Sequence, residues 1–150
     1  MCAHERSAGL LLLTQIQWVW KCDVSRHHIV ELGGICVVGW SGDVVDLDLG
    51  HPEGREAGFL HSAIVITVQQ ILDASPTVVH VVPLTSNIRM FHSEILIEPD
   101  NDNGLNIESA AQCQHLRAVS PQRIVATRGN IGPLNLPQIR ETLAVILDIA

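Results

Sequence analysis

Alternating apolar and polar residues predict the first strand of this chain. From Gly42 to Leu49 the sequence reads Gly-Asp-Val-Val-Asp-Leu-Asp-Leu, with apolar side chains at positions 45, 47 and 49. This period of two is typical of a strand that buries one face. Residues 50–58 contain Pro52, Gly54 and two glutamates, and this composition predicts a loop.

Further apolar segments predict the rest of a sheet, with strands at residues 63–68, 78–84, 93–98, 108–113 and 116–119. The segment 78–84 is rich in valine, which suits a strand buried on both faces, and Pro83 is expected to close its hydrogen-bond ladder. Thr85, Ser86 and Asn87 would then lie on the rim of the sheet. Acidic residues in 99–104 do not match the positions of an EF-hand, so a solvated turn is the better interpretation.

A helix is predicted at the C-terminus. Asn135 can cap it, Pro137 fits its first turn, and the apolar stripe consists of Ile139, Leu143, Ile146 and Leu147. Residues 120–123 predict a single helical turn. Five or six short strands with one C-terminal helix predict a mainly β, α+β fold, a small β-barrel capped by that helix, rather than alternating strands and helices.

Composition excludes several classes of function. A length of 150 residues with 47% hydrophobic residues allows one ordinary core. Aromatic residues make up 3%, so a row of base-stacking aromatic side chains is not expected. A net charge of −7 argues against broad electrostatic binding of nucleic acid, although a small groove with a few cations remains compatible with it.

The cysteines show no regular spacing and favour a reducing, cytoplasmic compartment. Cys22, His27, His28 and Cys36 match no usual zinc-finger spacing, so we expect no metal and no cofactor. The apolar run at residues 10–13 is too short for secretion or for crossing a membrane.

Residues 1–41 differ from the rest of the chain. They contain all three tryptophans and three of the four cysteines, and their charges balance, whereas the remainder has six basic and thirteen acidic residues. We therefore expect an N-terminal extension at 1–41, whose structure the pattern leaves open, and one domain at 42–150. An alternative is that 1–41 precedes the true start and is dispensable.

Several segments of residues 42–150 match known motifs in order along the chain. The segment 42–49 is similar to an opening strand of the form G-[DE]-[VI]-[WY]-x-[VA]-D-[LF], and 54–58 to a first loop, G-S-E-Q-x-G. The segment 81–87, Val-Val-Pro-Leu-Thr-Ser-Asn, matches V-x-P-[LI]-T-[ST], and 114–119 is similar to E-Q-[IL]-R-[AT]-[VL]. With these motifs in the same order over about seven tenths of the chain, residues 42–150 resemble the MazF/PemK family of toxin endoribonucleases.

The resemblance implies a Src-homology-3-like barrel of the MazF/PemK/CcdB toxin type and a homodimer. It also implies the toxin of a type II toxin–antitoxin system, a ribosome-independent and metal-independent endoribonuclease. Such an enzyme cuts single-stranded messenger, ribosomal or transfer RNA at short sequences by attack of the 2′-hydroxyl, which leaves 5′-hydroxyl ends. The implied partner is a MazE-type antitoxin whose acidic segment competes with RNA. DNA would be contacted only through the antitoxin, and no membrane is involved.

The resemblance assigns catalysis to an arginine and a threonine. Thr85 inherits the threonine role, but His61-Ser62 stands where the family has Arg-Pro. Either His61 carries protons in place of the arginine or the enzyme is impaired. Imidazole suits the task because it exchanges protons near neutral pH. The alternative is that His61 is a loop histidine without a catalytic role.

The resemblance also suggests substrate-binding residues. They are Glu56, Gly58, Ser86, Asn87, Arg89, His115 and Arg117. Arg89 could supply a guanidinium to phosphate, or it could be a solvated loop residue. Arg117 falls on a family arginine, and a role as a structural ion-pair partner is an equal alternative. His115 replaces a family glutamine, which could change the base preference or accompany a transfer-RNA target.

Two non-catalytic functions compete with the nuclease. A homologue lacking the arginine could act as a decoy that binds antitoxin. A gyrase poison of the same fold would need a Trp-Gly-Ile tail, whereas this chain ends Leu-Asp-Ile-Ala.

Overall fold

The computed structural model describes residues 39–51, 54 and 58–149. Residues 1–38, which make up nearly all of the expected N-terminal extension and include the Cys22, His27, His28 and Cys36 set, lie outside the described residues, as does Glu56.

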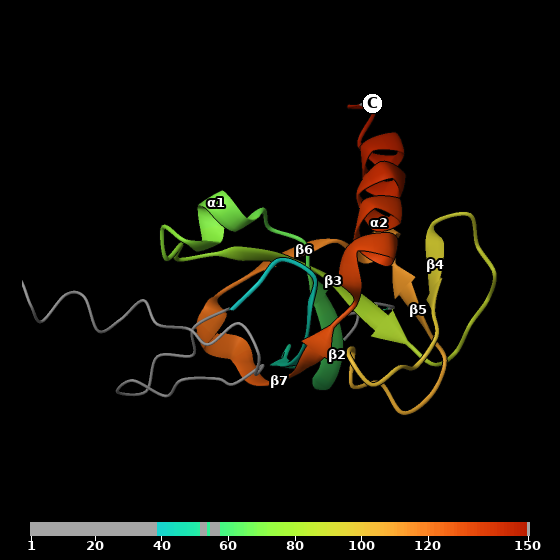
Figure 1. Cartoon of the computed structure of the whole chain (residues 1–150), viewed down its shortest axis with the longest axis horizontal. Helices are drawn as coiled ribbons and strands as arrows, with labels where there is room; N and C mark the ends of the chain where they lie inside the picture. The colour runs from blue at the N-terminus through green and yellow to red at the C-terminus, as the bar shows by residue number, and fades with distance from the viewer. Residues whose placement is uncertain (1–38, 52–53, 55–57, 150) are drawn as a thin grey trace, which may run out of the picture.

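Seven strands and a long C-terminal helix form the described domain (Figure 1). In chain order the elements are β1 (Asp43–Asp48), β2 (Leu60–Val65), α1 (Gln69–Leu72), β3 (Val79–Thr85), β4 (Glu94–Ile97), β5 (Ser109–Gln112), the 3-10 turn η1 (Cys113–His115), β6 (Arg117–Val119), the 3-10 turn η2 (Pro121–Arg123), β7 (Ile124–Asn130) and α2 (Gly132–Ile146). The expected mainly β fold with a C-terminal helix is confirmed.

All strand pairs are antiparallel, in the order β4-β5-β3-β2-β1-β7, and β6 also pairs with β3. β3 is the central element because its first half pairs with β6, its end pairs with β5, and β2 lies along its other edge. A strand covered on both faces needs apolar side chains on both, and β3 provides Val82 on one face and Val81 on the other.

Two apolar cores lie on the two faces of the sheet. One contains Val44, Ile64 and Val82 and is covered by Ile139 and Leu143 of α2. α2 contacts β4 and η1, and it stands at the β4–β5 end of the molecule in Figure 1. The other core gathers the residues one position along each strand, together with α1, β6 and β7. Its members include Val45, Leu47, Ala63, Val81, Leu72, Val119 and Ile124.

Three sequence predictions need correction. The second strand lies at 60–65 rather than 63–68, because Thr67 turns inward and its Oγ1 accepts the backbone N–H of His80 at 2.7 Å. Pro83 does not end the third strand, which continues to Thr85 by pairing with β5. The last helix begins at Gly132, with a proline in its first turn and Pro137 inside it.

Three elements were not predicted at all, namely β7, α1 and η1. β7 carries a weak apolar pattern but is held by its pairing with β1, and α1 is only one turn long. The single helical turn expected at residues 120–123 is confirmed as η2, where Ser120 Oγ accepts the backbone N–H of Gln122.

Candidate functional site

The register of β2 and β3 relates His61 to Thr85. The pairing of β2 with β3 runs from Val65 with Val81 to Ala63 with Pro83, and the same register continued two residues further would set His61 opposite Thr85. Residues opposed in an antiparallel pair project from the same face, and in regular sheet their Cβ atoms are about 5 Å apart. The two sequence-predicted catalytic residues therefore belong to one face and one end of the sheet.

His61 is half-buried, and its Nε2 is a buried atom without a hydrogen-bond partner among the residues that the structure describes. Its position on β2 is set by pairing with Leu47 of β1, whose side chain is fully buried. Unpaired buried nitrogens are uncommon and unfavourable, and because this nitrogen is buried, a hydroxyl or phosphate ligand could pair with it only if the ring turned toward the surface.

Thr85 ends β3 and begins an exposed turn. Its Oγ1 accepts the backbone N–H of Asn87 at 3.1 Å, which shapes the chain as it leaves the sheet. Ser86 and Asn87 are exposed beside it. The hydroxyl of Thr85 keeps its own proton for donation, because it acts only as an acceptor in this bond.

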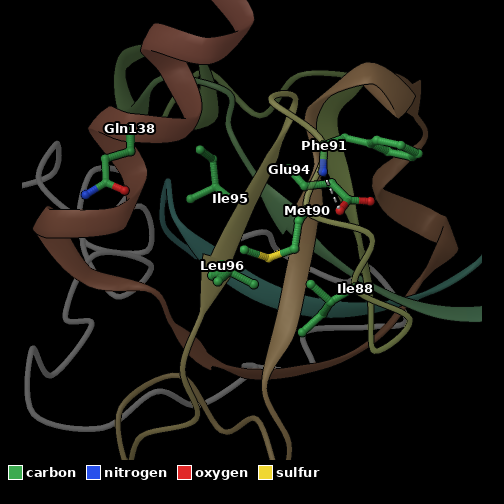
Figure 2. Close-up of a pocket in the computed structure, with 7 residues that line it drawn as sticks. All are labelled: Ile88, Met90, Phe91, Glu94, Ile95, Leu96 and Gln138. Carbon is green, nitrogen blue, oxygen red and sulfur yellow. Dashed lines mark hydrogen bonds between the residues drawn. The ribbon is translucent and has the colours of Figure 1, made fainter.

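Arg89 lies on the loop beyond this turn, and Glu94 holds that loop. Glu94 Oε2 accepts the backbone N–H groups of Arg89, at 3.0 Å, and of Phe91, at 3.4 Å. A pocket of about 300 Å³ lies between this loop, β4 and α2. Figure 2 shows Glu94 and Phe91 among the residues that line it. The pocket is lined by Ile88, Met90, Phe91, Glu94, Ile95, Leu96 and Gln138. It contains neither His61 nor Thr85, so it is separate from the candidate site.

The other sequence-predicted residues lie around this centre at different distances. Gly58 is half-buried just before β2, and η1, which ends at His115, contacts β3. Arg117 pairs with Val81, four strand residues before Thr85, which is about 13 Å along β3. The register therefore unites His61 and Thr85, while Arg117 projects from the same face further along it.

A second polar group occupies the opposite face at the same level. Ser62 Oγ donates to Asp46 Oδ1 at 2.7 Å, and Arg128 Nε donates to Asp46 Oδ1 and Oδ2 at 2.8 and 3.0 Å. No sequence pattern indicated this network, because β7 itself was not predicted. Ser62 stands where the resembling family has the proline of its Arg-Pro pair. Its side chain thus links β2 to β1 on the face opposite His61.

Within residues 39–51, 54 and 58–149, no group of three or more histidine, cysteine or acidic side chains is arranged to hold a metal ion. None of the helices described there is long and apolar enough to cross a membrane.

Comparison with known proteins adds independent findings. Residues 41–147 match a family described as PemK-like, MazF-like toxin of type II toxin-antitoxin system. The chain is 27% identical over 113 residues to endoribonuclease MazF9 of Mycobacterium tuberculosis (strain ATCC 25618 / H37Rv), covering 72% of this chain and 95% of that protein.

Solved structures agree on the fold. The crystal structure of MazF from Deinococcus radiodurans has a TM-score of 0.61 and 20% identity, with 73% of this chain and 96% of that chain covered. An endoribonuclease in complex with its cognate antitoxin, from Mycobacterial species, has a TM-score of 0.61 and 17% identity, with 75% and 97% covered.

Proposed function

Because the chain belongs to the PemK-like, MazF-like toxin family of type II toxin-antitoxin systems, we propose that it is a toxin endoribonuclease that cuts single-stranded RNA at specific sequences. The family match over residues 41–147 carries this proposal. The relative named endoribonuclease MazF9 supports a nuclease rather than a non-catalytic decoy. The products would carry 5′-hydroxyl ends, and the loss of translated or ribosomal RNA would stop growth.

We assign the chemistry to His61 and Thr85. The imidazole of His61 turns so that a ring nitrogen meets the rim and accepts the proton of the 2′-hydroxyl as its oxygen attacks phosphorus. The hydroxyl of Thr85 donates to a non-bridging oxygen of the phosphorane, where negative charge develops. The bond from phosphorus to the 5′-oxygen breaks, the 5′-oxygen takes a proton from water at the exposed rim, and the protonated His61 returns its proton to solvent. No metal ion enters this scheme.

Substrate binding falls to the residues around the pair. The turn of Ser86 and Asn87 offers hydroxyl and amide donors, and Arg89 offers a guanidinium. Glu56, Gly58, His115 and Arg117 complete the proposed groove. A MazE-type antitoxin would compete with RNA there, and we propose that the toxin acts in the cytoplasm as a homodimer.

The test is cleavage of total RNA in the presence of EDTA, followed by mapping of 5′-hydroxyl ends. We expect short shared sequences at the cut sites with the unmodified protein, and strongly reduced cleavage with His61→Ala and with Thr85→Ala. Expression should arrest growth, and coexpressed antitoxin should relieve the arrest. Cleavage that persists in both variants would refute the assignment of these residues, and absence of cleavage by the unmodified protein would refute the function.

A further inference from the structure

Phe59 is an exposed aromatic residue beside the candidate site. The chain has two phenylalanines, and the side chain of Phe59 is 59% exposed. Its backbone φ is 56°, in the left-handed region that favours glycine and is uncommon for a bulky residue. A large apolar side chain held outward in a strained conformation needs an explanation other than core packing.

Backbone hydrogen bonds hold Phe59 in this conformation. Phe59 N donates to Gly50 O at 2.6 Å, and Leu49 N donates to Phe59 O at 2.9 Å. Leu49 and Gly50, just after β1, thus face the single residue Phe59, just before β2, as in a β-bulge. Gly50 has a φ of +70°. Bulges redirect side chains and are frequent next to active sites.

His51 orients the ring of Phe59. The two ring centroids are 5.3 Å apart and the ring planes meet at 81°, an edge-to-face arrangement. Such a contact covers at most one face of the phenylalanine ring, so at least one face is not covered by His51. An exposed aromatic face with a fixed orientation is a surface on which a nucleic-acid base can stack.

Arg123 brings a positive charge to the same end of the hairpin. Its Nη1 donates to the backbone carbonyl of Asp48 at 3.0 Å, and it lies 3.9 Å from the position that a Cβ on Gly50 would take. It forms no salt bridge with any residue in the described part of the chain. The guanidinium therefore keeps donors and charge available for a phosphate.

This cluster lies next to the proposed catalytic pair. Phe59 immediately precedes β2, and His61 is the second residue of that strand. Arg123 precedes Ile124, which pairs with Leu47, and Leu47 pairs with His61. We propose that Phe59, oriented by His51, stacks on the base of a nucleotide adjacent to the scissile phosphate, and that Arg123 binds a phosphate of that nucleotide.

The inference rests on the proposed function and names how the RNA is bound. An extended peptide from an antitoxin is the competing occupant, but it would add to an open strand edge through backbone bonds. At this position Leu49 N, Gly50 O and both backbone groups of Phe59 are already paired with one another, and Gly50 N donates to Asp48 Oδ1. A ring face and a guanidinium suit a nucleotide better than a peptide.

The experiment measures binding rather than cleavage, so that it stays valid if the proposed function fails. A fluorescent pool of random single-stranded RNA 20-mers with 2′-O-methyl groups throughout, which cannot be cut, is titrated by anisotropy. We expect Phe59→Ala to raise Kd about 5-fold to 150-fold, the range for loss of one base stacking on an aromatic ring. Phe59→Trp should keep Kd close to the unmodified value.

Arg123→Gln should weaken binding and reduce the slope of log Kd against log salt by about 0.7, the change for one phosphate contact on a single strand. Val125→Ala is the matched control, because Val125 is 61% exposed on β7 and close to Arg123 in sequence. It should leave both the affinity and the salt slope unchanged.

A defined site, once mapped, permits a sharper test. An abasic nucleotide next to the scissile phosphate should weaken binding by the unmodified protein but cause no further loss with Phe59→Ala. Unchanged RNA affinity in a folded Phe59→Ala protein would overturn the inference. It would also be overturned if the loss of affinity from Phe59→Ala and the loss from an abasic nucleotide were independent at every position of that nucleotide. A loss confined to antitoxin binding would assign the cluster to the peptide instead. RNA binding that depends on Phe59 without any cleavage would uphold the inference and refute the nuclease.

Discussion

The guanidinium Nε of Arg128 donates to both carboxylate oxygens of Asp46, at 2.8 and 3.0 Å, and so joins β7 to β1. Asp46 also accepts the hydroxyl of Ser62 on β2, so one carboxylate connects three neighbouring strands. The side chains of Arg128 and Asp46 are 35% and 15% exposed, which leaves the pair partly screened by water.

We expect Arg128→Ala to lower the free energy of unfolding by about 1 kcal/mol, the upper range for a partly exposed ion pair. Asp46→Ala should cost more, because it leaves both the guanidinium and the hydroxyl of Ser62 without their acceptor. Urea unfolding measures both variants, with Glu141→Gln on the exposed side of α2 as the control. An Asp46→Ala protein as stable as the control would show that the network does not contribute.

His61 and Ser62 are adjacent but project from opposite faces of the sheet. We expect His61→Gln to lower kcat about 100-fold or more, because glutamine forms hydrogen bonds but cannot carry a proton. Ser62→Ala should lower the unfolding free energy by about 1 kcal/mol through the lost bond to Asp46 and leave kcat nearly unchanged. Single-turnover cleavage and urea unfolding measure the two effects. Equal losses of kcat in the two variants would contradict the assignment of proton transfer to the face that carries His61.

Local patterns predicted the sheet well where each strand buries its own apolar residues. The alternation at 42–49 and the valine run at 78–84 correspond to β1 and β3. β7 was not predicted because apolar and polar residues alternate only weakly in its sequence, Ile-Val-Ala-Thr-Arg-Gly-Asn. It is held instead by pairing with β1, which is distant in sequence. The start of the last helix was wrong because Asn135 lies inside it, where its Nδ2 donates to the carbonyl of Ile131 instead of capping.

The candidate site divides in the same way. Thr85 could be predicted from the rim motif that follows a buried strand, and His61 from its place in the resemblance. Their relation depends on the register between β2 and β3, which no local pattern contains. Arg123 and His51 were missed because each acts through a neighbour across the hairpin, Asp48 for one and Phe59 for the other.

Gly129 and Gly104 permit the loop at residues 98–104 to lie directly on β7. A Cβ on Gly129 would clash with the carbonyl oxygen of Asp102, and Asn130 N donates to that same oxygen at 2.8 Å. We expect Gly129→Ala to destabilise the fold by about 3 kcal/mol or more, because the backbone at Asp102 and Asn103 would have to move away from β7.

Gly132→Ala is the control for that prediction. Gly132 has a φ of +73° but open space around its Cβ position, so alanine there should cost only about 1 kcal/mol. Thermal unfolding compares the two variants. Similar losses would mean that the loop moves away from β7 at little cost.

Cys113 predicts how stability changes at high pH. Burial raises the pKa of its thiol from an ordinary value of 9.0 to about 11, although a backbone hydrogen bond opposes part of the change. Between these values the folded chain keeps a proton that the unfolded chain has lost, so the free energy of unfolding falls as pH rises. The loss should reach about 2 kcal/mol by pH 11. Cys113→Ala, less stable at neutral pH because of the cavity, lacks this contribution, so the difference between the two proteins should shrink from pH 9 to pH 11. Urea unfolding at fixed pH steps measures it, and a constant difference would show that the thiol reaches solvent in the folded state.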